Sequence, residues 1–314
     1  MAKKRQLSHK PGAERAPYRP DVIEKITVNA STADATAVGL LDALYAAMPH
    51  RKRLTVKDFL KHGQVMVDGN VTTRFDQPVT AASDIQVNIS RQWQTFSNPR
   101  LKIVYEDDDI IVVNKGYGLL SVGNDRVKEG TAYSLLRDYL KRRDQRNMLF
   151  IVHRLDQHTS GLMMFAKSEE AKLNMQHNWN NMVIDRRYAA IVEGVPEKKE
   201  GTIRSYLAEN TRMTVYSTDN PEEGKLAVTR WKLVKSRNGY SLLDISLDTG
   251  RKNQIRVHMH DMGHPIAGDR KYGARTSPAH RVALHARTLR FVHPITRADM
   301  RFEAPLPASF TRLV

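Results

Sequence analysis

The chain has 314 residues, enough for about two domains, and its 50 Lys and Arg residues outnumber 34 Asp and Glu residues, giving a formal net charge of +16. This excess favours a polyanionic partner such as nucleic acid, although it also aids solubility. The absence of cysteine excludes disulfides, cysteine–zinc sites and cysteine nucleophiles, and it fits a reducing compartment. No apolar run approaches the roughly 18 residues of a membrane span, and no apolar signal core follows Met1, so we expect neither insertion nor secretion.

Residues 1–20 form a basic, irregular segment. They contain six basic residues against one acidic residue, Glu14, for a net charge of +5. Pro or Gly at positions 11, 12, 17 and 20 interrupts any helical or strand periodicity. This composition predicts a disordered basic arm, which serves either as a plain tail or as a contact to phosphates.

Residues 21–90 have the pattern of a small domain of helices and strands. Its first helical face is formed by residues spaced i, i+3, i+4 and i+7, namely Leu41, Leu44, Tyr45 and Met48. We expect Thr55 to cap a second helix that ends at Gly63. A strand, an Asp-Gly hairpin turn and a return strand follow, and residues 84–89 predict a last strand.

Five basic residues of this domain crowd one short segment. They are Arg51, Lys52, Arg53, Lys57 and Lys61. Like charges four positions apart on a helix repel by about 0.2–0.5 kcal/mol, and a phosphate backbone would reverse that cost. The basic second helix, followed by Gly-x-Val-x-Val-x-Gly over residues 63–69, resembles the S4-type RNA-binding module. The resemblance implies that the cluster binds RNA, and the alternative is a solvated basic face.

A polar stretch at 91–100 reads as a linker, and we expect the second domain to span 101–314. Apolar periodicity and capping residues predict its elements. In chain order they are strands at 103–105 and 110–114, a helix capped by Thr131, a helix at 169–183, a strand at 185–194 and a helix carrying Ile255 and Met259.

The stretch Ile151–Ser168 places polar residues between two apolar strands. The polar residues are His153, Arg154, Asp156, Gln157, His158, Thr159 and Ser160. Buried charge is costly unless it is paired, so ionisable groups at the edge of a core indicate a specific structural or functional role. An ordinary polar loop is one interpretation. A hydrolase is another, although no G-x-S-x-G elbow surrounds Ser160.

The same stretch resembles the catalytic signature of the RluA/RluD-type pseudouridine synthases. The matching residues are His153, Arg154, Leu155, Asp156, Thr159, Ser160 and Gly161. Further segments resemble the family in the same order: a basic pair with Tyr188 in 185–194, then Gly-Arg-x-x-Gln-Ile-Arg-Val-His at 250–258, then a closing strand. The chain departs from the family at Gly116, where Pro is usual, and at Lys252–Asn253, where Thr-His is usual.

Three nearby histidines raise a metal-dependent hydrolase as an alternative. They are His258, His260 and His264. Their spacing is not H-E-x-x-H and no cysteine is present, so we expect no metal site.

The family resemblance implies conversion of uridine in RNA to pseudouridine, an isomerisation that needs no cofactor or metal. By the family pattern, Asp156 is the essential carboxylate at the ribose, acting as nucleophile or base. Tyr188 stacks on the base and assists loss of its proton, and Arg256 keeps Asp156 ionised. Arg154 fills the space of the flipped base or grips phosphate, and Arg251 is expected to contact RNA.

The resemblance also implies an α+β fold with a mixed, mainly antiparallel sheet, flanking helices and a central cleft, beside the small N-terminal module. Because S4-type modules occur on members that modify ribosomal RNA, the expected partner is 23S ribosomal RNA or a ribosome-assembly intermediate. The alternatives are a tRNA pseudouridine synthase and a non-catalytic S4-type RNA-binding or ribosome-assembly protein. We expect a monomer located in the cytoplasm.

Overall fold

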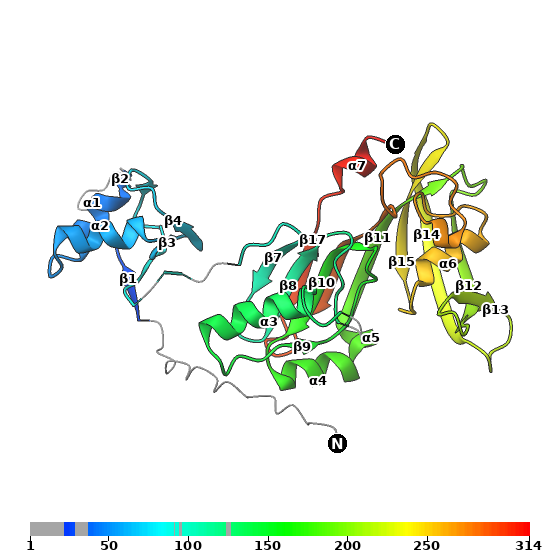
Figure 1. Ribbon diagram of the computed structural model, residues 1–314, viewed down its shortest axis with the longest axis horizontal. Helices are drawn as coiled ribbons and strands as arrows, with labels where there is room; N and C mark the ends of the chain where they lie inside the picture. Colours follow the sequence, from blue (N-terminus) through cyan, green and yellow to red (C-terminus); the bar gives the residue numbers. More distant parts are fainter. Residues whose placement is uncertain (1–21, 29–36, 91, 94–95, 124–126) are drawn as a thin grey trace, which may run out of the picture. The chain divides into compact units, whose positions relative to one another are not determined.

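The structure is a computed structural model that describes residues 22–28, 37–90, 92–93, 96–123 and 127–314 (Figure 1). The arm predicted at 1–20 lies outside the described residues. The chain divides into two compact units, the first comprising Met1–Thr95 with Arg142–Arg146 and the second comprising Phe96–Lys141 with Asn147–Val314, and each unit has its own hydrophobic core. Within the described ranges, no helix combines the length and apolar character needed to cross a bilayer.

The first unit packs two helices against a small antiparallel sheet. Its elements are β1 (Ile23–Ile26), β2 (Val38–Gly39), α1 (Leu40–Ala47), α2 (Arg53–Lys61), β3 (Val65–Val67), β4 (Asn70–Thr72), β5 (Pro78–Val79) and β6 (Ile85–Asn88). Four strands pair in the order β1-β6-β3-β4, and β2 pairs with β5. Asp68 and Gly69, with φ of 49° and 76°, form the predicted hairpin turn between β3 and β4.

The helices of the first unit differ in detail from the prediction. In α1, Leu40 is fully buried, whereas Leu41 of the predicted face is only partly buried. The prediction that Thr55 caps α2 is wrong. The extended main chain of Lys52 takes the cap position without a side-chain hydrogen bond, so Thr55 already lies within the first turn. The apolar face of α2 is buried as expected through Val56, Phe59 and Leu60.

The second unit is built on one large sheet. Its elements are β7 (Leu101–Glu106), β8 (Ile110–Lys115), α3 (Ala132–Arg143), β9 (Phe150–Ile151), β10 (Ser160–Ala166), α4 (Glu169–His177), α5 (Trp179–Met182), β11 (Val183–Glu193), β12 (Glu200–Glu209), β13 (Val215–Thr218), β14 (Lys225–Arg237), β15 (Tyr240–Leu247), α6 (Gln254–Asp261), the 3-10 helix η1 (Arg270–Tyr272), β16 (Leu284–Val292), β17 (Asp299–Glu303) and α7 (Ala308–Thr311).

The strand order is β13-β12-β14-β15-β11-β16-β10-β8-β7, with β17 beside β16 and β9 beside β10. Among these described strands, β10 and β16 form the single parallel pair, through Ser160–His285 and Gly161–Ala286. The prediction of a mixed, mainly antiparallel sheet is therefore confirmed.

Two apolar strands, β8 and β10, lie side by side in the sheet and are covered on both faces. Ile111, Val113 and Phe165 pack in the cluster that contains α3, whereas Ile110 and Met164 pack in the cluster that contains α4 and α5 residues. Neighbouring residues of a strand point to opposite faces, so a strand covered on both sides has no polar face. This explains why continuous apolar runs correctly predict both strands.

The end of the predicted linker at 91–100 belongs to the second unit. Phe96 lies edge-to-face with Tyr139 of α3, with ring centroids 5.5 Å apart. The Gly116 N–H donates to the Arg100 carbonyl at 2.7 Å. This bond also accounts for the departure from the family at Gly116. Proline has no N–H to donate, and a Cβ at this position would lie 2.9 Å from the same carbonyl oxygen.

Candidate active site

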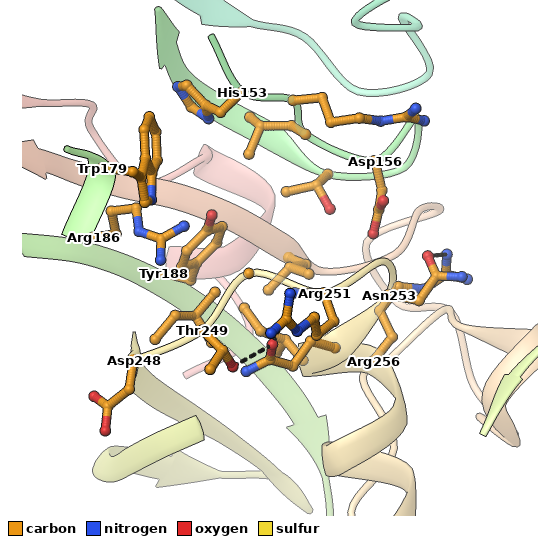
Figure 2. A pocket seen from close by; sticks show the side chains of 18 of the residues that line it. His153, Asp156, Trp179, Arg186, Tyr188, Asp248, Thr249, Arg251, Asn253 and Arg256 are labelled. Atoms are coloured by element: carbon orange, nitrogen blue, oxygen red, sulfur yellow. Dashed lines mark hydrogen bonds between the residues drawn. The ribbon is translucent and has the colours of Figure 1, made fainter. Parts of the chain in front are cut away.

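A cavity of about 450 Å³ opens on the second unit between three segments (Figure 2). The turn from β9 to β10 contributes residues between 152 and 159, α5 and the first half of β11 contribute residues between 179 and 188, and the loop into α6 contributes 247–256. The fold thereby brings together five residues that the sequence singled out, namely Arg154, Asp156, Tyr188, Arg251 and Arg256.

Asp156 lies at the centre of the first segment. The Thr159 N–H donates to the Asp156 main-chain carbonyl at 3.0 Å, which closes the turn before β10. Burial raises the pKa of the Asp156 carboxyl, while Arg256, Arg154, Lys115 and a hydrogen bond from the Asn253 main-chain N–H act to lower that pKa. The carboxylate is therefore desolvated and surrounded by cations.

Asn253 supplies the hydrogen bond to Asp156 from the start of α6. Its backbone is left-handed, with φ of 54°, a conformation in which Asn is enriched among non-glycine residues. The Asn253 side chain accepts from the Arg256 Nη1 at 3.1 Å and donates to the Tyr272 hydroxyl at 3.1 Å. The departure from the family at Lys252–Asn253 thus places an Asn whose side chain binds Arg256 and whose main chain acts to lower the pKa of Asp156.

Lys115, which the sequence analysis did not select, lies behind Asp156 at the end of β8. It is fully buried, and its Nζ donates to the carbonyls of Leu119 at 2.8 Å and Gly116 at 3.1 Å. Burial, aided by the nearby Arg281, lowers the pKa of Lys115 to about 7, and Asp156 opposes this shift. The sequence feature that could have indicated Lys115 is its position, at the end of an apolar strand and directly before a glycine.

Arg256 is bound directly to a carboxylate other than Asp156. Its Nε and Nη2 donate to the two oxygens of Asp269 at 2.6 and 2.7 Å, and both side chains are buried. Its guanidinium also lies 4.9 Å from the Tyr272 ring centroid. Arg256 thus acts on Asp156 through its charge, while Asp269 fixes its position. Asp269 was not predicted from the sequence. It lies 13 residues after Arg256, a separation that does not indicate a contact within one helix or strand.

Tyr188 extends from β11 toward the cavity (Figure 2). Burial raises the pKa of its phenol, and the positive charge of Arg186 acts to lower it. The register of β11 against β16 shifts between Arg187 and Tyr188. A bulge of this kind re-aims a side chain and is common beside active sites. It was not predictable from the alternation of apolar residues.

The Thr-Ser-Gly part of the signature joins the turn to β16. Ser160 is buried, its Oγ lies 2.8 Å from the Nδ1 of His285, and it accepts a hydrogen bond from Arg281 at 2.7 Å. Gly161 has φ of +114°, and a Cβ there would lie 2.1 Å from the Ala286 carbonyl oxygen. Only glycine allows this approach of β10 to β16. The motif therefore anchors the segment that carries Asp156.

Arg154 and Arg251 are exposed residues of the cavity rim. The Nε of Arg251 donates to the Leu226 carbonyl at 3.0 Å. Within the described ranges, neither guanidinium has a carboxylate within 4.0 Å. Both charges are thus available to an anionic ligand at the mouth of the cavity.

The basic cluster of the first unit separates into two groups. Arg51 is ion-paired with Glu24 and lies over the Phe59 ring, and Arg53 lies over the Tyr45 ring. The other members, Lys52, Lys57 and Lys61, are exposed and have no carboxylate within 4.0 Å in the described part of the chain. Four of the five predicted RNA-binding residues thus have no carboxylate within 4.0 Å in the described ranges, and one of these, Arg53, also packs on Tyr45.

Two of the three histidines of the metal hypothesis, His258 and His264, make separate hydrogen bonds within the protein. The buried His258 lies 2.8 Å from the Thr229 hydroxyl and 3.0 Å from the Ser205 hydroxyl. His264 lies 2.8 Å from the Glu193 carbonyl. The described residues contain no group of three or more His, Cys, Asp or Glu side chains suited to a metal ion.

Comparison with known proteins identifies a matching family model and relatives that carry the same family name. Residues 109–261 match the family model for RNA pseudouridylate synthase. Ribosomal large subunit pseudouridine synthase D of Haemophilus influenzae is 32% identical over 308 residues, which cover 92% of this chain and 94% of that protein. The uncharacterized RNA pseudouridine synthase YjbO of Bacillus subtilis is 35% identical over 214 residues, covering 68% of this chain and 75% of that protein.

Solved structures resemble about two-thirds of this chain. Human RNA pseudouridylate synthase domain containing 4 matches with a TM-score of 0.56 and 24% identity, covering 67% of this chain and 92% of that one. The human domain-containing 1 protein matches with a TM-score of 0.54 and 25% identity, covering 68% and 89%. At this level of identity the likeness speaks for a shared fold.

Proposed function

This chain belongs to the RNA pseudouridine synthase family of isomerases, and on that premise we propose that Asp156 is its catalytic carboxylate and that large-subunit ribosomal RNA is its substrate. Two carboxylates line the cavity. Asp248 is ion-paired with Arg230 at 2.8 Å, whereas Asp156 has no cation within 4.0 Å in the described ranges and is held by the Asn253 main chain. This uncommitted carboxylate among cations is the observation that carries the assignment.

The reaction rearranges one nucleotide without an oxidant or an imported group. The N1–C1′ glycosidic bond of uridine breaks, the uracil turns, and a C5–C1′ bond forms. The proton on C5 is lost and N1 gains one, so atoms and charge balance. The target base must first leave its stack, at a cost of a few kcal/mol. No cofactor or metal is needed for these steps.

The residues of the cavity have separate roles in this proposal. Asp156 attacks C1′ or removes a proton from the ribose. Arg256 and Lys115 favour its ionised form against burial. Tyr188 stacks on the uracil and assists loss of the C5 proton. Arg154 fills the space left by the base or holds phosphate, and Arg251 contacts the RNA at the rim.

Replacement of Asp156 by Asn tests the assignment. The substitution keeps the size of the side chain and removes the carboxylate, so we expect pseudouridine formation to be abolished while thermal unfolding and RNA affinity stay near wild type. The control is Asp108→Asn, which changes an exposed Asp in the β7–β8 turn and should leave turnover unchanged. Turnover by purified Asp156→Asn protein, free of wild-type enzyme, would overturn the assignment.

The ribosomal substrate is supported by the relative named ribosomal large subunit pseudouridine synthase D, which this chain matches over 94% of its length. We infer that the first unit is an S4-type RNA-binding module and that the protein works as a cytoplasmic monomer. Mapping pseudouridine in total RNA from a deletion strain tests the substrate. Sites lost from large-subunit rRNA would support it, whereas sites lost only from tRNA would refute it.

A further inference from the structure

Arg186 is a cation in the cavity wall that no carboxylate balances. Its side chain is half-buried and lines the cavity two residues before Tyr188. Across the part of the chain that the structure describes, its guanidinium has neither an ion pair under 4.0 Å nor a hydrogen bond. Partial burial of an unpaired cation costs free energy, and an anion bound in the cavity would offset that cost.

The neighbouring Arg187 behaves differently. Successive residues of a strand point to opposite sides, so Arg187 lies away from the cavity. Its Nε donates to Asp185 at 2.9 Å and its Nη1 donates to Asp244 at 2.8 Å. Of the basic pair in β11, one member is therefore neutralised by the protein and the other is left for a ligand.

The position of the Arg186 guanidinium is fixed by packing. It lies over the Trp179 ring, 5.4 Å from the centroid, and the His153 ring lies 5.0 Å from that of Trp179. A Cβ at Gly250 would come within 3.1 Å of the Arg186 Nη1, so the glycine makes room for it. Figure 2 shows Trp179, Arg186 and Tyr188 in succession along one wall, across the cavity from Asp156.

We propose that Arg186 binds a phosphodiester group of the RNA beside the target uridine. An aromatic ring over one face of a guanidinium leaves its N–H edge available, and that edge matches two oxygens of a phosphate. The charge, the placement beside Tyr188 and the lack of a protein carboxylate all favour an anion over a neutral base. This assignment rests on the proposed function, because it needs RNA in the cavity.

The test is the salt dependence of RNA binding. A fluorescently labelled oligouridylate is titrated with the full chain carrying Asp156→Asn, which prevents turnover, and with the same protein carrying Arg186→Met, Arg186→Lys or Arg187→Met. Each lost contact to single-stranded RNA should flatten the slope of log affinity against log salt by about 0.7. We expect this for Arg186→Met, with roughly tenfold to hundredfold weaker binding. Arg186→Lys should keep the slope, and Arg187→Met should match the parent.

An unchanged slope in folded Arg186→Met protein would overturn the inference, as would an equal loss in Arg187→Met, which changes net charge by the same amount. Turnover is measured separately for Arg186→Met in the chain that retains Asp156. A changed pH profile of that turnover, with an unchanged salt slope, would mean that Arg186 acts through Tyr188 and would also overturn the inference. These outcomes are distinct from failure of the proposed function, in which the unmodified chain itself forms no pseudouridine.

Discussion

At the scale of single residues, the site shows how a buried carboxylate is kept chargeable. Burial raises the pKa of Asp156, and three cations, Arg256, Arg154 and Lys115, act to lower it from different parts of the fold. Arg256 is held in place by its own carboxylate, Asp269, while Lys115 is held by main-chain carbonyls. The supporting charges are thus fixed by partners other than Asp156, whose own carboxylate forms no ion pair under 4.0 Å within the described residues.

Replacing Lys115 by Met should move the acid limb of the pH–rate profile to higher pH. A nearby cation lowers the pKa of a carboxyl, so its removal raises the pKa of Asp156 further above the ordinary value. Because the pKa of Lys115 is about 7, the lysine is mostly charged below that pH and lowers the pKa of the carboxyl there. The measurement is kcat/KM against pH, with Lys102→Met, an exposed lysine of β7, as the control. Coinciding acid limbs in all three proteins would contradict this role.

Breaking the ion pair behind the site should cost stability. Asp269→Asn leaves the Arg256 guanidinium buried without its carboxylate, for an expected loss of about 3–5 kcal/mol in the free energy of unfolding. Asp248→Asn removes a pair whose side chains are 59% and 43% exposed, and it should cost far less because water screens the pair. Urea unfolding monitored by circular dichroism gives both values. Similar small losses would show that the buried pair contributes no more than a surface one.

At the scale of elements, the contact of β10 with β16 positions the turn that carries Asp156. Gly161→Ala would place a methyl group against the Ala286 carbonyl, so the two strands must separate. Gly239→Ala, in the turn between β14 and β15, also has a positive φ of 77° but open space around it, and should cost only about 1–2 kcal/mol. We expect Gly161→Ala to be the more destabilising in thermal unfolding and to lose turnover. Equal effects would mean that backbone strain alone, and not the strand contact, requires glycine at 161.

Several elements were predictable because their signals are local. Apolar runs correctly predict β8 and β10, and Thr131 caps α3 as expected, with the Ser134 N–H donating to its hydroxyl at 3.1 Å. The start of α2 was missed because its cap is main-chain geometry and not a side chain. The contacts of Asp269, of Arg186 and of the bulge before Tyr188 join segments that meet only in the fold, so spacing along the chain did not reveal them.

At the scale of the whole molecule, the chemistry and the additional basic surface lie in different units. Every residue that lines the cavity belongs to the second unit, whereas Lys52, Lys57 and Lys61 belong to the first. Since Phe96 and Arg100 contact the second unit's core, a shortened chain must begin at Phe96 and not after the predicted linker. This division allows binding and turnover to be tested separately.

A protein of residues 96–314 should fold and keep residual turnover at high substrate concentration, because it retains the cavity and its clusters. It should bind long RNA more weakly and with a shallower salt slope. Phosphate contacts add affinity with little sequence information, and each one lost flattens the slope by about 0.7–0.9. The measurement is a binding titration at several salt concentrations, run on the full and shortened chains with the same RNA.

A full chain with Lys52, Lys57 and Lys61 changed to Gln separates the exposed lysines from the rest of the first unit. If these lysines contact phosphate, the variant should show part of the decrease in salt slope that truncation causes. Its turnover of a short substrate should stay unchanged. Coinciding slopes for all three proteins would mean that the lysines are a solvated surface and that the first unit does not bind RNA. Loss of all turnover in a folded 96–314 protein would instead mean that the first unit is needed for the reaction itself.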